Sequence, residues 1–279
     1  MRDIGRTLRD ARKRIGLVPT MGALHDGHLQ LIREAKRRTD VVVTTVFVNP
    51  AQFGLGEDFE RYPRNLAQDA RLAAEAGSTY IFAPSAAVMY PPGYSTYVNV
   101  EKVTEVLEGK FRAGHFRGVA TVVVKLLNIV RPDVALFGQK DAQQVIVIRQ
   151  LLRDLDLGVD LVVVPTVREP DGLAMSSRNV HLSVTERAQA PVLYRALDHA
   201  RGMITGGERS CRRIMDSMVA VIREQSAAQI DYVSIADAGT LEEQEIILPG
   251  RPLLISLAAR FGATRLIDNI TIETAIHET

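Results

Sequence analysis

The sequence feature that most constrains the fold is an apolar, β-branched run over residues 41–48. A strand with one solvated face alternates apolar and polar residues, whereas a continuous apolar run indicates a strand covered on both faces. Similar short runs at residues 15–18, 134–137 and 159–164 are separated by segments with helical periodicity. Such alternation predicts parallel strands joined by helices, which is an α/β, Rossmann-like, doubly wound parallel sheet.

The remaining pattern divides the chain into a larger and a smaller domain. In the first part we expect a helix over residues 65–76 that Asn65 caps and Gly77 ends, a strand over 79–82, an edge strand over 97–100, a buried helix over 118–130 and a helix over 141–155. The pattern then changes to helices over 184–204 and 208–225, the first opened by a capping box at Ser183–Glu186, and strands over 231–236 and 253–258. We therefore predict a Rossmann-like domain over residues 1–170 and a smaller C-terminal α+β domain over residues 171–279.

Composition narrows the classes of function. The 279 residues carry 34 basic and 33 acidic side chains, so a broad basic surface for nucleic acid is not expected. A single cysteine, Cys211, excludes an intramolecular disulfide framework and a cysteine-rich zinc site. No signal peptide is visible, and the longest apolar stretches are too short to span a bilayer. The expectation is a cytoplasmic protein with no membrane partner.

Residues 18–28 read as a strand end and a tight loop that opens into a helix. Pro19 ends the strand, and Gly22 and Gly27 allow the backbone to approach a ligand closely. A helix beginning near Gly27 would present unpaired N–H groups and the positive end of its dipole, which favours phosphate. His25 and His28 lie three positions apart, so both imidazoles could donate to phosphate oxygens. The alternative is a capped turn with two surface histidines.

Two further strand ends carry polar side chains. Asn49 and Gln52 follow the run at 41–48, and ligands of open α/β sheets lie beyond the carboxyl ends of strands. Ordinary Asn-Pro turn chemistry is the alternative for Asn49. At residues 137–144, Lys140 could offer a positive charge to phosphates, with Gln144 one turn further along. A helix start in which Asp141 caps and Gln144 completes a capping box would explain the same residues.

The fourth polar stretch is Met175, Ser176, Ser177 and Arg178, just past the predicted domain boundary. Hydroxyls and a guanidinium in a mobile loop can fold over phosphates and exclude water. Taken alone, this stretch is equally typical of a solvated linker.

Together these stretches resemble a known family. His25 to His28 are similar to the HIGH signature of class I nucleotidyltransferases, and Met175 to Arg178 are similar to the mobile loop of that superfamily. Residues 18–28, 47–53, 62–64, 115–118, 138–144 and 164–179, in this order, resemble the pantothenate synthetase family over nearly the whole chain. Gln139 and Ala142 depart from that family, which usually has an acidic residue and an aromatic residue there.

The resemblance implies a ligase that uses ATP and Mg²⁺. Pantoate would attack the α-phosphorus of ATP to give pantoyl adenylate and pyrophosphate, and β-alanine would then displace AMP to form pantothenate. Charge that develops at phosphorus can be stabilised by His25, His28 and Lys140, with His28 in the proton-donor role. The family's ATP-binding positions correspond to Met21, Gly22, Ala23, Leu24, His25, Asp26, Gly27, His28, Gly138, Gln139, Lys140, Asp141, Val167, Met175, Ser176, Ser177 and Arg178.

The resemblance also implies the other ligand positions. Gln52 and Gln144 match the pantoate-binding glutamines, with Gln52 also near β-alanine. Asn49, His115 and Arg117 are the remaining predicted substrate-binding residues. Asp69 matches a position linked to the metal. The family likeness also implies a homodimer.

Other functions remain open at this point. A transferase that moves AMP onto a phosphorylated metabolite would share the histidine motif and the loop, but it has no need of paired glutamines. A class I aminoacyl-tRNA synthetase would be expected to carry a basic RNA-binding extension, which this chain lacks. A nucleotide sensor without catalytic activity would bind ATP and release no pyrophosphate.

Overall fold

The computed structural model describes residues 1–54 and 56–274. It divides the chain into two compact units, Met1–Pro165 and Thr166–Thr279. The second unit therefore begins at Thr166, whereas the sequence pattern placed the boundary after residue 170. Within the described residues, no helix is long and apolar enough to cross a membrane.

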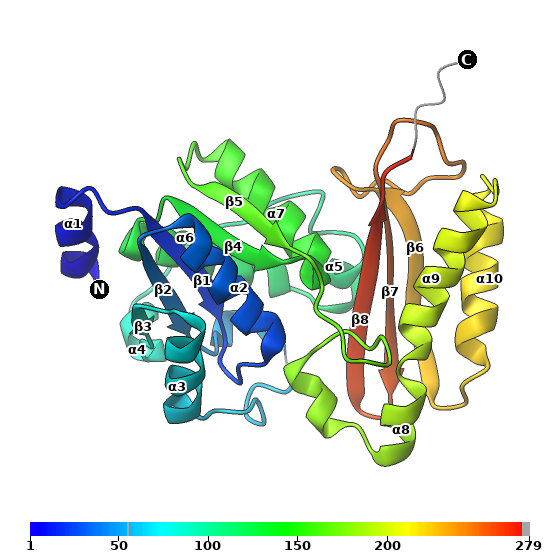
Figure 1. Cartoon of the computed structure of the whole chain (residues 1–279), viewed down its shortest axis with the longest axis horizontal. Helices are drawn as coiled ribbons and strands as arrows, with labels where there is room; N and C mark the ends of the chain where they lie inside the picture. The colour runs from blue at the N-terminus through cyan, green and yellow to red at the C-terminus, as the bar shows by residue number, and fades with distance from the viewer. Residues whose placement is uncertain (55, 275–279) are drawn as a thin grey trace. The chain divides into compact units, whose positions relative to one another are not determined.

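The first unit is built on a five-stranded sheet with strand order β3-β2-β1-β4-β5 (Figure 1). All neighbouring strands pair in parallel. The strands are β1 (Ile15–Thr20), β2 (Val41–Val46), β3 (Tyr80–Phe82), β4 (Val134–Gly138) and β5 (Asp160–Val164). This order confirms the predicted doubly wound sheet, and its topological switch lies between β1 and β4.

Helices and short turns connect these strands. They are α1 (Arg2–Asp10), α2 (Asp26–Arg38), the 3₁₀ turn η1 (Pro50–Gln52), α3 (Leu66–Ala76), α4 (Ala86–Met89), α5 (Glu108–Phe111), α6 (His115–Val130), the 3₁₀ turn η2 (Gln139–Asp141) and α7 (Ala142–Asp154). The helix α2 packs with α3 and against β1, whereas α6 packs with α7. Apolar residues of α2 and the sheet, among them Val18, Ile32 and Leu136, are fully buried between these layers.

Several predicted boundaries in this unit were wrong for identifiable reasons. No strand forms over residues 97–100, because the Val98 N–H is taken by the Thr121 hydroxyl of α6 instead of a strand partner. The helix α6 begins at His115 and includes Gly118 in its first turn. That glycine belongs inside the helix because a Cβ there would lie 2.1 Å from the carbonyl oxygen of Ala51, so only glycine allows α6 to pack on η1. The strand β2 ends at Val46, before the chain turns into η1.

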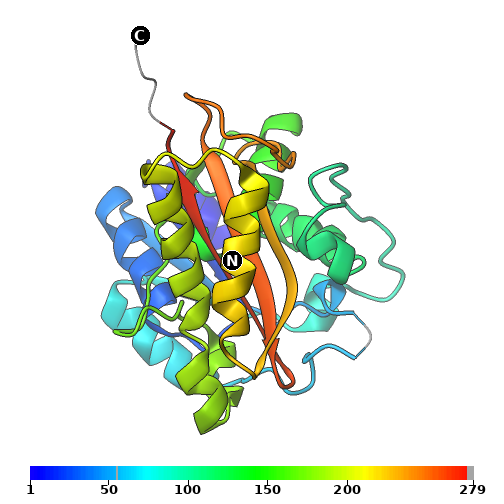
Figure 2. The same cartoon turned by 90° about the vertical axis from the view of Figure 1, so that its right-hand side faces the viewer.

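The second unit is an antiparallel sheet with strand order β6-β7-β8, covered by helices. Its elements are η3 (Ser177–His181), α8 (Val184–Gln189), α9 (Val192–Thr205), α10 (Cys211–Arg223), β6 (Ala228–Asp237), β7 (Leu253–Phe261) and β8 (Thr264–Ile272). Figure 2 shows α9 and α10 side by side over one face of this sheet. Cys211 is buried in that core and acts as a small packing residue.

Two predictions for this unit need correction. The single helix expected over residues 184–204 is broken into α8 and α9, with Pro191 at the junction. Proline lacks the N–H that would continue α8, so the chain starts a new helix there. The strand β8 was not anticipated, since its alternation is interrupted by Asp268 and Asn269, which are buried. The capping box at Ser183 and Glu186 is confirmed.

Candidate functional site

Three of the predicted polar stretches follow strands at one edge of the first unit's sheet. Residues 21–28 follow β1, residues 49–52 follow β2, and residues 139–144 follow β4. These strands are neighbours in the order β2-β1-β4, and all three run in the same direction. Their carboxyl ends therefore bring the three stretches to one place, at and beside the topological switch where ligands of open α/β sheets bind.

The two histidines of the first stretch are fixed by each other at the start of α2. His25 is the N-cap, and its Nδ1 accepts the backbone N–H of Gly27 at 3.2 Å. The backbone N–H of His25 in turn donates to Nδ1 of His28 at 3.3 Å, which completes a capping box. Because a backbone N–H can only donate, both Nδ1 atoms are acceptors and each neutral ring carries its proton on Nε2. In this tautomer the ring donor of each histidine is its Nε2–H group.

Packing and charge keep His28 neutral. The two imidazole rings lie 4.0 Å apart, centroid to centroid. Burial, then the neighbouring His25, then the Lys140 ammonium hold the pKa of His28 well below its usual value. Lys140 of the β4 turn is thus near enough to His28 of the β1 turn to lower its pKa, and the two turns follow neighbouring strands.

Gly27 and Gly138 differ in what surrounds them. A Cβ at Gly27 would lie 2.9 Å from a ring carbon of His25, so the glycine of the motif is needed for the capping ring. A Cβ at Gly138 would meet no atom within 4 Å. The space beside Gly138 at the end of β4 is therefore open, as expected where a ligand approaches the backbone.

Both carboxylate oxygens of Asp69 accept backbone N–H groups of the protein. It lies in the first turn of α3 and is 2% exposed. Its Oδ2 accepts the Ala23 N–H at 3.1 Å and its Oδ1 accepts the Leu24 N–H at 2.8 Å. Among the described residues, no group of three or more His, Cys, Asp and Glu side chains is placed to hold a metal ion. The metal role of Asp69 stays a prediction, and its contacts are with the backbone of the loop after β1.

The amide of Asn49 is used entirely by the protein. Its Nδ2 donates to Gln52 Oε1 at 3.0 Å and to the Gly118 carbonyl at 3.1 Å. Its Oδ1 accepts the Ala51 N–H and the Tyr90 hydroxyl, the latter at 2.8 Å. These bonds fill the two donor and two acceptor positions of an amide. The turn-chemistry alternative for Asn49 thus agrees with the geometry, and Asn49 orients Gln52 from behind.

Gln52 keeps capacity for a ligand. While its Oε1 is held by Asn49, its Nε2 donates to the Met21 sulfur at 3.2 Å. A thioether is a weak acceptor, so a substrate oxygen would compete for that N–H group with ease. This contact also links the β1 and β2 turns.

The backbone of Gln52 is supported by a buried network. His115 Nδ1 donates to the Gln52 carbonyl at 2.8 Å, and its Nε2 accepts from Arg112 at 3.0 Å. Arg112 is bidentate to Glu57, at 2.7 and 2.8 Å. Burial, followed by the Arg112 charge, lowers the pKa of His115 to about 4. His115 was predicted to bind substrate directly, and here both of its ring nitrogens are used within the protein.

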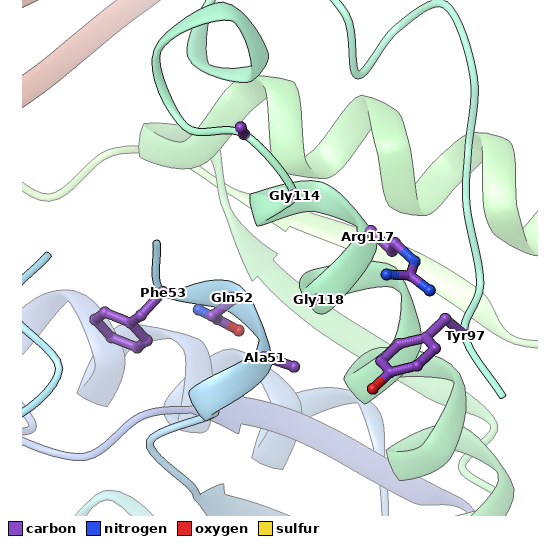
Figure 3. A pocket seen from close by; sticks show the side chains of 8 residues that line it. Ala51, Gln52, Phe53, Tyr97, Gly114, Arg117 and Gly118 are labelled. Atoms are coloured by element: carbon purple, nitrogen blue, oxygen red, sulfur yellow. The ribbon is translucent and has the colours of Figure 1, made fainter. Parts of the chain in front are cut away.

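A pocket of about 130 Å³ lies beside Gln52. Arg117 stacks over the Tyr97 ring at 3.9 Å along one side of it, and Gln52 and Phe53 lie on the other (Figure 3). Drug-sized ligands occupy pockets of roughly 300–1,000 Å³, so this space suits a small metabolite. Arg117 and Gln52, both predicted substrate-binding residues, line the same pocket.

Adjacent glutamines at the start of α7 have different surroundings. The side chain of Gln143 is buried, and it donates to the carbonyls of Val103 and Val106, both at 2.8 Å, and accepts the Glu108 N–H at 3.0 Å. Gln144 makes none of these bonds and is partly exposed. Asp141 precedes α7 without a side-chain capping bond, so the geometry does not agree with the capping-box alternative for this stretch.

In the second unit, the predicted loop is a short, internally bonded segment. The Met175 N–H donates to the Val167 carbonyl at 3.0 Å, and the Ser176 hydroxyl caps η3 by accepting the Arg178 N–H at 3.2 Å. Ser177 and Arg178 are both partly buried. The base of the loop is held by Arg168, which is bidentate to Asp268 at 2.6 and 3.0 Å.

Sequence reasoning missed the residues that support the site. Tyr90, Arg112 and Glu57 lie in none of the motifs, and Gln143 lies within residues 138–144 but was given no role. The contacts of Tyr90 with Asn49, of Arg112 with Glu57 and of Gln143 with Glu108 span 35 to 55 positions, so local spacing carries no signal for them.

The comparisons with known proteins agree over the whole chain. The family model for pantoate-beta-alanine ligase matches residues 1–271. The pantothenate synthetase of Acetivibrio thermocellus is 52% identical and covers 98% of this chain and 96% of its own. That of Heliobacterium modesticaldum is 57% identical, covering 93% and 92%.

Solved structures give the same result. Pantothenate synthetase from Thermus thermophilus matches with a TM-score of 0.90 at 46% identity, covering 95% of this chain and 96% of its own. Pantoate-beta-alanine ligase from Francisella tularensis, complexed with beta-gamma ATP and beta-alanine, matches with a TM-score of 0.76 at 34% identity, covering 96% and 94%. With the family model matched over residues 1–271 and the fold matched over 95% of its length, the chain belongs to the pantoate–β-alanine ligase family.

Proposed function

We propose that this protein joins pantoate and β-alanine to form pantothenate at the expense of ATP, through a pantoyl-adenylate intermediate. The observation that carries the proposal is the cluster of His25, His28 and Lys140 at the switch between β1 and β4. A carboxylate reacts poorly with an amine at neutral pH. Converting it to an acyl phosphate anhydride replaces one difficult step by two easier ones.

The phosphate side of the reaction needs donors aimed at developing charge. In the first step a pantoate carboxylate oxygen bonds to the α-phosphorus, and the bond from that phosphorus to the bridging oxygen of pyrophosphate breaks. The Nε2–H groups of His25 and His28 and the Lys140 ammonium can donate to the oxygens that gain charge, and the positive end of the α2 dipole favours the same charge. Ser176, Ser177 and Arg178 remain predicted ATP ligands.

Pantoate, the acceptor of the adenylate group, must be recognised by neutral hydrogen-bonding side chains of the protein. We assign pantoate to the Nε2–H of Gln52 and to Gln144, because both amides have capacity that the protein does not use. The pocket beside Gln52 has a guanidinium, Arg117, on its wall and suits the small carboxylate β-alanine. In the second step the amine attacks the acyl carbon, the bond to the AMP oxygen breaks, and the amine loses a proton.

The predicted Mg²⁺ has no dedicated protein cage among the described residues. Magnesium is usually bound by one or two carboxylates together with substrate phosphates. A cation that enters with ATP would screen phosphate charge without a preformed site. The homodimer and the cytoplasmic location also remain predictions.

The test is ATP–pyrophosphate isotope exchange with and without pantoate, omitting β-alanine. We expect exchange only with pantoate present, and AMP equal to pantothenate once β-alanine is added. ADP as the product, or exchange that needs no pantoate, would contradict the proposal. An AMP transferase would instead require a phosphorylated acceptor, and a nucleotide sensor would bind ATP without any exchange.

A further inference from the structure

The loop between β1 and the histidine pair has an unusual backbone. Gly22 has φ +85° and the next residue, Ala23, has φ +50°. Two successive residues at positive φ reverse the chain tightly, in a region that glycine adopts readily. Alanine rarely adopts such a conformation unless its surroundings impose it. Contacts with another part of the protein must therefore stabilise the backbone of this loop.

The partner of the loop is the carboxylate of Asp69. It accepts the Ala23 N–H on one oxygen and the Leu24 N–H on the other, at 3.1 and 2.8 Å. A Cβ at Gly22 would lie 2.8 Å from Asp69 Oδ2, so the carboxylate also packs against the glycine. The two backbone N–H groups of the loop thus donate to a carboxylate of the protein itself.

Asp69 is itself held firmly. It lies in the first turn of α3, where the helix dipole favours a negative charge, and Asn65 caps that helix through the Gln68 N–H. With 2% of its surface exposed, the carboxylate has little room for a hydrated metal ion. The helix α3 therefore presents a fixed carboxylate to the loop.

We infer that Asp69 is a positioning residue, an internal anion that fixes residues 22–24 and thereby the N-cap His25 that follows directly. It acts through the loop and holds neither the metal nor the phosphates, so phosphate is received by the histidines and the start of α2. The inference rests on the proposed function only in assigning catalysis to those histidines. Misplacing such donors slows adenylation more than it weakens substrate binding.

The test compares Asp69→Asn with Glu75→Gln, a control on the exposed side of α3 where Glu75 pairs with Arg71. An asparagine keeps the size but loses the charge, and its NH₂ would face a backbone donor. In Asp69→Asn we expect the exchange rate at saturating substrates to fall about 10- to 100-fold. We expect the Mg²⁺ concentration for half-maximal rate to stay unchanged, and Glu75→Gln to resemble the parent chain.

Hydrogen exchange gives a readout that does not depend on activity. The Ala23 and Leu24 amides should lose protection in Asp69→Asn, while amides of the buried strand β1, such as Leu17, stay protected and show that the unit is folded. Rate recovery in excess Mg²⁺ with protection intact would make Asp69 a metal ligand and overturn the inference. Unchanged rate and protection would overturn it as well.

A second variant approaches the same contact from the loop. Gly22→Ala puts a methyl group against the carboxylate, and its effect on the exchange rate should be smaller in an Asp69→Ala background than in the parent chain. Equal effects in both backgrounds would contradict the contact. If the parent chain shows no pantoate-dependent exchange at all, the proposed function fails, while the amide protection still decides the role of Asp69.

Discussion

The turns after β1 and β2 stand at the same edge of the sheet but are held in different ways. After β1, a carboxylate from another helix grips the backbone, and the histidine side chains present donors. After β2, one amide side chain, Asn49, is used entirely to orient another, Gln52. Some polar residues of these turns can donate to a ligand, whereas others hydrogen-bond a neighbouring residue and hold it in place. The sequence alone does not distinguish these two roles.

If His28 of the β1 turn and Lys140 of the β4 turn act on developing charge, removing either donor should give the largest effect on rate. For His28→Ala or Lys140→Ala we expect adenylation to slow by about 10² to 10³, or roughly 2.7–4 kcal/mol, with pantoate binding largely kept. Single-turnover formation of pyrophosphate and equilibrium binding of pantoate measure the two quantities. Normal adenylation in either variant would remove these residues from the chemical step.

If Gln52 of the β2 turn and Gln144 of α7 recognise pantoate, variants at these positions should change its binding. Gln52→Ala and Gln144→Ala should each weaken pantoate by about 1.5–3 kcal/mol, the usual cost of a hydrogen bond to a charged group, while ATP affinity stays nearly constant. The matched control is Gln143→Ala, which should lower the free energy of unfolding because three buried partners are left unpaired. Loss of ATP binding in the Gln52 or Gln144 variant would reverse the assignment.

The network under Gln52 should make stability depend on pH. The pKa of His115 is about 4 in the folded protein and 6.5 in the unfolded chain, so the unfolded state binds the extra proton between these values. Stability is complete above pH 6.5 and falls as pH decreases towards 4, by about 2 kcal/mol at pH 5.

Urea unfolding at pH 7 and pH 5 measures this effect. In His115→Asn the part of the pH dependence that comes from this residue should vanish, although the variant is less stable at pH 7. His181→Ala, which removes an exposed histidine of η3, should keep the parent's pH dependence. An equal pH dependence in His115→Asn and the parent would show that His115 is not the group concerned.

The smallest effect on pantoate binding is expected from Tyr90, whose hydroxyl donates to Asn49 Oδ1. Tyr90→Phe removes one hydrogen bond to Asn49 Oδ1 and keeps the ring, so the apparent KM for pantoate should rise by a factor that corresponds to about 0.5–1.5 kcal/mol. Tyr80→Phe on the edge strand β3 is the control. A larger loss in Tyr90→Phe than in Gln52→Ala would mean that Asn49 contacts the substrate itself.

Much of the fold followed from local pattern. Continuous β-branched runs such as β2 can only be buried on both faces, and this requirement predicted the parallel sheet. Local rules also predicted the caps at Asn65 and Ser183, because a capping side chain bonds to backbone within three residues. A parallel sheet also places the polar turns at one edge, because the carboxyl ends of parallel strands lie at the same edge of the sheet.

Tertiary structure decided what each polar residue does there. The family resemblance linked Asp69 to a metal, and only folding brings its carboxylate to amides 45 and 46 positions earlier. The same holds for Asn49, Gln143 and His115, whose partners come from distant segments. The hydrogen-bonding capacity of a side chain is a property of its residue type, so the sequence alone determines it. Whether it is used by the protein or left for a ligand depends on which groups the fold buries beside it.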